Sequence, residues 1–572
     1  MGKNIHEVIV VGSGAGGGMV AHNLTQAGVN VVMLEAGRKY NPRTETNMFG
    51  LPSQSPLRGE RTPDKQGGFY DATIGGGEIP GEPYTKGDGN GQYWWRARML
   101  GGRTNHWGRK TPRYGPDDFK TYTNTGREID WPISYEDIAP YYDRVDALIG
   151  VFGANETEAQ HNAPVTPNHI RQSPPEPKIT ELVFAKACGE LGIKTRAAET
   201  AILTKPLGDR AACFYATDCS RGCSTGAGFD SVLGFINPAL KTGRLDIIAD
   251  AMVSKVLMDK QNKKAIGVRY IDKTTGDSKD IFARVIILAA STMATSRILL
   301  NSNNKKSPRG LANSSGLVGK YLADTSGAFL ILQIPALENL PAQNEDGVYE
   351  HHLYAPWWLH GKSKEKAGAD FSGGYQTTIK NHRSGLPTMG KLATISSLKK
   401  GLYGKRLKQH MRYYYGTTAI LYCLGAVSLN ENCKLTIDPK VKDQWGIPVP
   451  KVDWTSSHED YQRLLHMYES LHKIAQQMGA IVISDPSVAL KQAGKITDPV
   501  GAVHETGGCR MGANPKTSVL NPWSQSWDVP NLYVADGAPF VTHPEKNPTL
   551  TIMALALRAS DNIIKRLKEN SL

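Results

Sequence analysis

The chain has 572 residues, enough for two or more domains that each bury a core, and its 40% hydrophobic and 21% charged residues are those of a globular protein. Its net charge is +13, but the lysines and arginines are scattered, which predicts a solvated basic surface or an acidic partner rather than nucleic-acid binding. No apolar run approaches the roughly 18 residues of a spanning helix, so we expect no transmembrane segment.

The first segment leads directly into a predicted nucleotide site. We expect no secretory signal, because "MGKNIHE" leads directly into a short β-branched strand predicted at 8–11. Gly12, Gly14 and Gly17 then form G-x-G-x-x-G at the start of a helix, which lets the backbone approach a pyrophosphate closely. A second strand ends on Glu35, whose carboxylate is placed to accept the ribose hydroxyls. This pattern predicts a dinucleotide but does not separate NAD from FAD.

Three of the seven cysteines lie close together in "AACFYATDCSRGCSTGAGFDS", residues 211–231. Cys213, Cys219 and Cys223 have the spacing C-x5-C-x3-C, with no histidine in the stretch, whereas zinc sites usually have closer pairs and four ligands. Free or disulfide-bonded cysteines are a second interpretation. An iron–sulfur cluster is the third and best supported, because glycine and serine backbone amides are available to the sulfides. The other four cysteines are dispersed, which predicts no disulfide framework and a reducing environment during folding.

The middle of the chain is interpreted from its periodicity. Alternating runs at 244–259 and 264–272 predict paired strands, and 283–302 predicts a buried strand, a turn of small residues and a helix. Two further strands are predicted within 433–454, and a long helix at 461–479.

The C-terminal part contains two motifs that identify a family. "HETGGCRMG" occupies 504–512, and a strand at 532–535, a turn at 536–537 and a helix at 549–567 follow in "NLYVADGAPFVTHPEKNPTLTIMALALRASDNIIKRL". With the glycine fingerprint and "GGRTNHWG" at 101–108, these segments resemble the glucose–methanol–choline (GMC) family of FAD oxidoreductases. They occur in family order and span nearly the whole chain.

The resemblance implies FAD as the cofactor and an α/β fold. One domain is a Rossmann-like FAD-binding domain with a doubly wound parallel sheet, and the second is an α+β substrate domain built on an antiparallel sheet. The resemblance divides the chain into segments 1–125, 206–325 and 496–572 of the FAD-binding domain, with the cysteine loop in the second, and segments 126–205 and 326–495 of the substrate domain.

Flavin contacts are also implied by the resemblance. Besides the glycine fingerprint and Glu35, the expected cofactor-binding residues are Gly102, Asn105, His106, Asp536, Gly537 and Thr549. "GGRTNHWG" is similar to the flavin loop of the sugar-oxidising branch, notably of pyranose oxidase, in which the histidine of a Thr-His-Trp stretch carries a covalent flavin link. Because Asn105 replaces that threonine here, covalent and non-covalent binding at His106 both remain open.

The family positions that face the flavin from the substrate side are occupied by His504 and Asn547. Oxidising an alcohol requires its O–H proton to leave as hydride moves to the flavin, and a neutral imidazole suits that role of base. An amide beside it can hydrogen-bond the same oxygen and orient the C–H bond. His543 is a weaker candidate as a pocket residue.

The resemblance is strongest to the bacterial glucoside 3-dehydrogenases and FAD-dependent glucose dehydrogenases. It implies oxidation of a secondary hydroxyl of a glucoside or pyranose, with C3 favoured, to a keto sugar. Three cysteines at similar spacing hold a [3Fe-4S] cluster in such enzymes, which passes electrons singly to an acceptor such as a cytochrome or a quinone. A small, signal-bearing hitch-hiker subunit would take the protein to the periplasm; a cytoplasmic location is the alternative.

Two rival functions remain open at this point. One is a pyranose or glycoside oxidase that returns electrons to O2 and uses the cysteines structurally. The other is a non-catalytic flavin-binding subunit, which the presence of both His504 and Asn547 disfavours.

Overall fold

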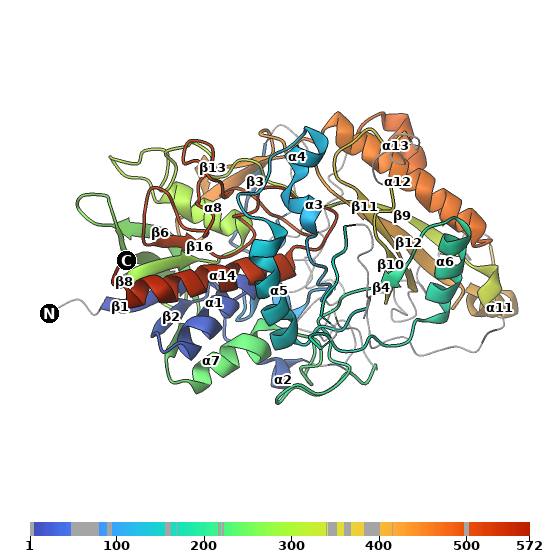
Figure 1. Cartoon of the computed structure of the whole chain (residues 1–572), viewed down its shortest axis with the longest axis horizontal. Helices are drawn as coiled ribbons and strands as arrows, with labels where there is room; N and C mark the ends of the chain where they lie inside the picture. The colour runs from blue at the N-terminus through green and yellow to red at the C-terminus, as the bar shows by residue number, and fades with distance from the viewer. Residues whose placement is uncertain are drawn as a thin grey trace.

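Two large β-sheets, one mostly parallel and one antiparallel, organise the protein (Figure 1). The computed structural model describes residues 5–46, 48, 79–87, 94–154, 162–167, 169–215, 219, 222–338, 340, 352–359, 368–381, 401–414, 416–496 and 503–572.

The seven-stranded sheet has the order β5-β2-β1-β8-β7-β6, and β16 also pairs with β8. β5, β2, β1, β8 and β16 run parallel. β7 pairs antiparallel with β8, and β6 pairs antiparallel with β7. The parallel strands are rich in buried valine and isoleucine, as expected of a sheet covered on both faces. The strands are β1 (Ile5–Val11), β2 (Val31–Leu34), β5 (Leu245–Ile248), β6 (Ala251–Met258), β7 (Ala265–Asp272), β8 (Ser278–Leu288) and β16 (Leu532–Val534).

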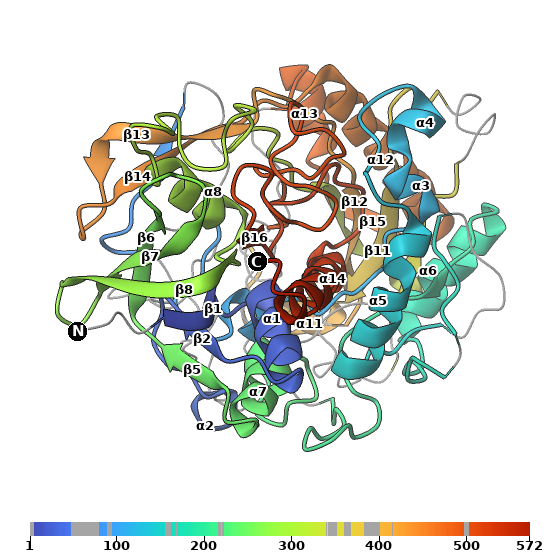
Figure 2. The same ribbon diagram turned by 60° about the vertical axis from the view of Figure 1, so that its left-hand side comes forward.

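Helix α1 (Ala15–Gln26) packs against β1 and β2, and α14 (Thr549–Lys568) lies beside α1 (Figure 2). Leu550, Met553 and Leu557 are buried on one face of α14, with the spacing of an amphipathic helix. Three basic residues in its last turn complement the negative end of the helix dipole. Because α1 is the first helix and α14 the last, their packing brings the two ends of the chain together. The motifs at both ends therefore lie at the same sheet.

The antiparallel sheet has the order β15-β9-β12-β11-β10-β4 and lies on the opposite side of the molecule (Figure 1). Helices α12 (His458–Gln477) and α6 (Ile179–Glu190) pack on it. The N-terminus of α12 is fixed by a capping box between Ser457 and Asp460. The strands are β4 (Arg196–Ala197), β9 (Ser326–Gln333), β10 (Leu353–Ala355), β11 (Tyr375–Asn381), β12 (Thr418–Gly425) and β15 (Ile481–Ser484).

A three-stranded sheet, β13-β14-β3, completes the strand topology of the described residues. Its strands are β3 (Thr85–Lys86), β13 (Lys434–Lys442) and β14 (Pro448–Asp453). The other helical segments are α2 (Pro42–Glu45), η2 (Gly102–Asn105), α3 (Pro116–Phe119), α4 (Thr121–Thr125), α5 (Tyr135–Ile149), η4 (Val232–Ile236), α7 (Asn237–Lys241), α8 (Thr292–Asn301), η5 (Pro335–Leu337), α11 (Gly404–Tyr414) and α13 (Ser487–Ala493).

The predicted α/β fold class is confirmed, and one predicted element is wrong. The run 244–259 is two strands rather than one, because the chain turns at Asp250, where φ is +53°. β5 joins the parallel edge beside β2, and only β6 pairs with β7 as expected. The boundaries proposed for the two domains stay a prediction. Across the described ranges, no helix is long and apolar enough to cross a membrane.

Candidate active site

A cavity of about 250 Å3 lies at the carboxyl ends of the parallel strands, where open α/β sheets bind their ligands. Gly12 follows β1, Glu35 follows β2 and Asp536 comes shortly after β16. The predicted site residues that line the cavity are Gly12, Gly14, Glu35, Gly102, His106, His504, Asp536, Gly537, Asn547 and Thr549. Gly17 and Asn105 are not among the lining residues. The fold thus brings together motifs that are more than 500 residues apart in sequence.

The glycine turn allows the backbone to come very close to the neighbouring strand. Gly12 has φ +101°, and a Cβ there would lie 2.3 Å from the carbonyl oxygen of Ala289. A Cβ on Gly17 would lie 2.0 Å from the carbonyl oxygen of Gly12, so Gly17 serves the packing of the turn. Helix α1 starts after Gly14, which offers no side-chain cap, and this leaves its first N–H groups available to an anion.

Glu35 is only 5% exposed, and hydrogen bonds hold its carboxylate at the cavity wall. Oε2 accepts from the Ser13 backbone N–H at 3.1 Å and hydroxyl at 2.5 Å, and Oε1 accepts from Gly37 N–H at 2.7 Å. Burial raises the pKa of Glu35, and the hydrogen bonds from Ser13 and Gly37 oppose that rise. Ser13 Oγ also accepts from Gly101 N–H at 2.9 Å, which ties the first motif to "GGRTNHWG".

The "GGRTNHWG" loop presents His106 to the cavity and turns Asn105 away from it. The Asn105 amide donates to the Leu100 carbonyl oxygen at 2.9 Å, so this side chain braces the loop. Arg103 forms an ion pair of 2.7 Å with the buried Glu505, the neighbour of His504 in sequence. The loop is therefore anchored directly to the C-terminal motif.

His504 and Asn547 are in direct contact at the cavity. The Asn547 Nδ2 atom lies 3.0 Å from His504 Nε2, and His504 Nδ1 lies 2.8 Å from Thr325 Oγ1. With the amide nitrogen donating to Nε2, the ring proton sits on Nδ1 and is donated to Thr325. Asp324 accepts from the backbone N–H groups of His504 and Thr325, at 2.9 and 2.6 Å, and so fixes both residues.

Thr325 and Asp324 were not among the predicted site residues. They precede β9, and nothing in their local sequence distinguishes them from other loop residues. Their role depends on a contact across about 180 residues of chain.

His543 lies next to His504, with 6.4 Å between the ring centroids, but in a different environment. It is 2% exposed, and its Nδ1 lies 2.9 Å from Thr506 Oγ1. Burial, with a smaller effect from His504, lowers its pKa well below the usual value, so the ring is neutral. Within the described residues, His543 Nε2 has no hydrogen-bond partner.

The three clustered cysteines line one small cavity of about 20 Å3, although residues 216–218, 220 and 221 lie outside the described part. Cys213 Sγ accepts from Tyr215 N–H and Cys223 Sγ from Gly228 N–H, both at 3.4 Å. Among the described residues, no three His, Cys, Asp or Glu side chains are grouped closely enough to hold a metal ion. A cavity of this size holds about one water molecule, which is smaller than an iron–sulfur cluster.

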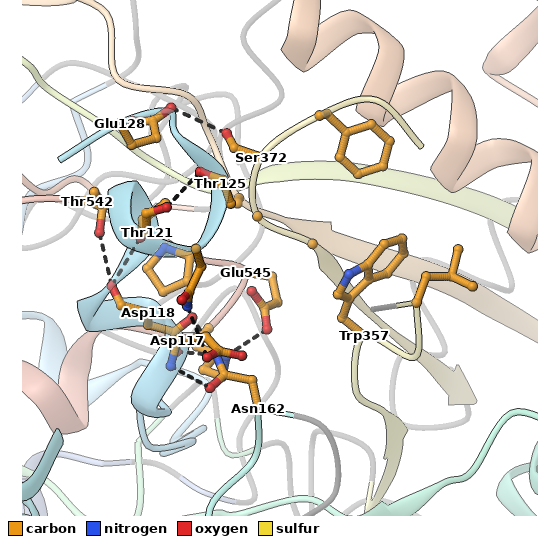
Figure 3. Close-up of a pocket in the computed structure, with 18 of the residues that line it drawn as sticks. Asp117, Asp118, Thr121, Thr125, Glu128, Asn162, Trp357, Ser372, Thr542 and Glu545 are labelled. Atoms are coloured by element: carbon orange, nitrogen blue, oxygen red, sulfur yellow. Dashed lines mark hydrogen bonds and ion pairs between the residues drawn. The ribbon is translucent and has the colours of Figure 1, made fainter. Parts of the chain in front are cut away.

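A second and larger cavity, of about 780 Å3, lies toward the antiparallel sheet (Figure 3). Residues 542–546 form part of its wall, and Asn547, next in the chain, lines the first cavity. Here Lys546 Nζ lies 2.9 Å from Asp118 Oδ2 and 2.7 Å from Glu545 Oε1. Sequence reasoning missed this cavity, because its walls come from distant segments with no shared motif.

The first cavity fits the dinucleotide that the sequence predicts. The glycine turn has no room for a Cβ on Gly12 or Gly17, and the start of α1 has no side-chain cap. Glu35 offers a buried carboxylate. These are the three features that recognise a pyrophosphate and a ribose. Bound there, FAD would be held by the glycine turn and Glu35, and it would supply a hydride acceptor.

Comparison with known proteins gives the family. Models of the GMC oxidoreductase family match residues 8–325 and 430–556. The chain is 32% identical to 2-methyl-1,2-propanediol dehydrogenase of Mycolicibacterium austroafricanum, over 98% of this chain and 96% of the relative. It is 28% identical to the fructose dehydrogenase large subunit of Gluconobacter japonicus, over 98% of each. It is 24% identical to C-glycoside 3-oxidase of Microbacterium trichothecenolyticum, over 59% and 57%.

A solved structure shows the same fold. Pyridoxine 4-oxidase from Mesorbium loti superposes with a TM-score of 0.64 at 14% identity, covering 97% of this chain and 99% of that one. The chain therefore belongs to the GMC oxidoreductase family and is an FAD-dependent oxidoreductase of sugar or alcohol CH–OH groups.

Proposed function

We propose that the protein is a dehydrogenase that oxidises a secondary hydroxyl of a glucoside or pyranose, with C3 favoured, to a keto sugar. The contact between His504 Nε2 and Asn547 Nδ2 carries this proposal, because it places a proton acceptor and a hydrogen-bond donor side by side at the cavity. A hydroxyl group is both a donor and an acceptor, so one alcohol fits between the two side chains.

His504 and Asn547 have different roles toward the bound alcohol. With Nδ1 protonated, Nε2 is the basic nitrogen of His504. A bound hydroxyl takes the place of the Asn547 amide on Nε2, which accepts the hydroxyl proton as the C–H bond is broken. Asn547 donates to the same oxygen and orients the carbon. Thr325 holds the ring from behind and keeps Nε2 directed at the cavity.

The names of two relatives support a sugar substrate. One is described as a fructose dehydrogenase large subunit and another as a C-glycoside 3-oxidase. The second name is the reason to favour C3.

We further propose that Cys213, Cys219 and Cys223 hold a [3Fe-4S] cluster, which supplies one-electron transfer to an external cytochrome or quinone. Two observations support it: the three side chains line one cavity, and backbone N–H groups already donate to two of the sulfurs. A small hitch-hiker subunit and a periplasmic location belong to the same proposal. The description of one relative as a large subunit is consistent with a partner subunit.

An oxidase is the second candidate, because one relative is named as an oxidase. It would share the sugar site and the roles of His504 and Asn547. The two candidates differ only in where the electrons go.

The test is a panel of glycosides assayed with an artificial electron acceptor, followed by NMR of the products. We expect a 3-keto glycoside, with much faster dye reduction than hydrogen peroxide formation. Peroxide formed at a comparable rate would favour the oxidase, and no turnover of any glycoside would contradict both.

A further inference from the structure

The larger cavity is acidic, although the protein as a whole carries a net charge of +13. Five carboxylates and two cationic side chains line it among the described residues, namely Asp117, Asp118, Glu128, Asp370 and Glu545 with Arg127 and Lys546. The lining carboxyl groups thus outnumber the lining cations by three. Figure 3 shows Asp118, Asn162 and Glu545 on one side of the cavity and the Trp357 indole on the other.

Both lining cations already form ion pairs within the cavity wall. Lys546 lies between Asp118 and Glu545, so it neutralises only one of two carboxylates. Arg127 pairs with Asp370 at 2.9 Å. Asp117 and Glu128 form no ion pair with any described residue.

Glu128 is held in position by an unusual backbone conformation. Its φ is +68°, a region that residues with a large side chain rarely occupy and that costs energy to maintain. Leu429 N–H donates to both carboxylate oxygens, at 2.9 and 3.1 Å, and the Ser372 hydroxyl lies at 3.4 Å. The structure thus fixes a carboxylate at the cavity wall.

The surroundings of Glu128 favour a cation. Burial raises the pKa of Glu128 to about 7. Glu459 and Asp460 on α12 raise this pKa further, whereas the hydrogen bond from Leu429 N–H and the charge of Arg463 lower it. A bound cation would relieve this repulsion.

An independent observation points to a ligand in this cavity. His543 lines it and is 2% exposed, yet its Nε2 atom has no hydrogen-bond partner among the described residues. Buried polar atoms are nearly always paired, so a ligand group is the expected partner. Trp357 offers an aromatic face on which a sugar ring or a cation can pack.

We propose that this cavity binds the substrate as a cationic, amino-substituted glycoside. This rests on the proposed function. The Glu128 carboxylate attracts the ammonium group, and His543 Nε2 meets a hydroxyl. The wall that contains His543 continues into Asn547, so a glycoside held here lies beside the His504–Asn547 pair.

The test compares matched substrates under anaerobic conditions, with flavin reduction as the signal. The probes are methyl glucoside, methyl aminodeoxyglucosides with the amine at C2 or at C6, and their N-acetyl forms. We expect at least one amine to have a kcat/KM at least tenfold above that of methyl glucoside, and N-acetylation to abolish this preference.

Two variants test whether the Glu128 carboxylate causes the preference for amines. Glu128→Gln keeps an acceptor for Leu429 N–H and removes the negative charge, so we expect the amine-to-neutral ratio of kcat/KM to fall at least fivefold. Asp246→Asn removes an exposed carboxylate on β5, in the other sheet, and should leave the ratio unchanged. Thermal unfolding confirms that both variants are folded.

Different outcomes of these experiments test the preference for amines and the proposed function separately. Turnover of methyl glucoside without a preference for either amine, or an unchanged ratio in Glu128→Gln, would overturn the inference and leave the proposed function intact. Failure of every glycoside to reduce the flavin would contradict both.

Discussion

At the residue scale, the hydrogen bonds around His504 orient the imidazole for the role of base that we propose. Thr325 on one side and Asn547 on the other determine which nitrogen carries the proton. In the proposed mechanism, Nε2 then carries the lone pair that a substrate hydroxyl meets in place of the Asn547 amide.

Replacing His504 with alanine should lower the rate of flavin reduction by roughly 10²–10⁴-fold, the usual contribution of general base catalysis. Stopped-flow absorbance with excess glycoside measures this rate directly. A near-normal rate would remove His504 from the mechanism.

Thr325→Val should slow flavin reduction about tenfold, because the ring loses the partner of Nδ1 and its preferred tautomer. Thr325→Ser restores the hydroxyl and serves as the matched control. Equal rates in the valine and serine variants would show that Thr325 does not position the base.

At the element scale, the turn between β1 and α1 is the most demanding part of the nucleotide site. Gly12→Ala would force a Cβ to 2.3 Å from the Ala289 carbonyl oxygen at φ +101°, so we expect protein purified without FAD. Gly28→Ala, at φ +88° but with no atom within 4 Å of the new Cβ, is the control and should keep its FAD at a cost of about 1 kcal/mol. Flavin absorbance per protein measures the outcome, and a yellow Gly12→Ala protein would contradict it.

A second element, the helical turn η4, depends on a buried carboxylate. Asp230 Oδ1 accepts from Leu233 N–H at 2.8 Å, and burial raises the Asp230 pKa to about 6 from 3.8, despite Arg109 and Arg210. The folded chain therefore binds this proton more tightly than the unfolded chain, and stability is lost as pH rises from 4 to 6. Relative to Asp230→Asn, the wild type should lose about 3 kcal/mol over this range. Urea unfolding at several pH values measures it; parallel pH profiles would contradict the assignment.

The sequence predicted the elements that depend on local pattern. The G-x-G-x-x-G turn, helix α14 and strand β8 lie where their periodicity places them. The prediction of a single strand at 244–259 was wrong because two successive strands continue the same alternation of apolar and polar residues. Only the turn at Asp250 separates them. Positioning residues such as Thr325 could not be predicted, since their partners lie far away in sequence.

At the scale of the whole molecule, we propose that the sugar binds between the two large sheets and that electrons leave through the cysteine loop. The carboxylates of the larger cavity come from segments around 117–128, 370 and 545, and only the folded topology brings them together. No local sequence pattern predicts that cavity.

The cysteine loop gives a prediction on this scale. Anaerobically purified protein should contain iron and acid-labile sulfide, and Cys219→Ser should lose both while glycosides still reduce its flavin. Cys188→Ala, at a buried cysteine on α6 that belongs to a different hydrophobic cluster from Cys219, is the control that keeps its iron. Iron-free wild-type protein after reconstitution would rule out the cluster.

The most direct test of the central claim is anaerobic flavin reduction by methyl glucoside carrying deuterium at C3, compared with the unlabelled sugar. We expect flavin bleaching, a primary isotope effect on its rate and a 3-keto product by NMR. Bleaching with no isotope effect from C3 and a product oxidised at another carbon would contradict it.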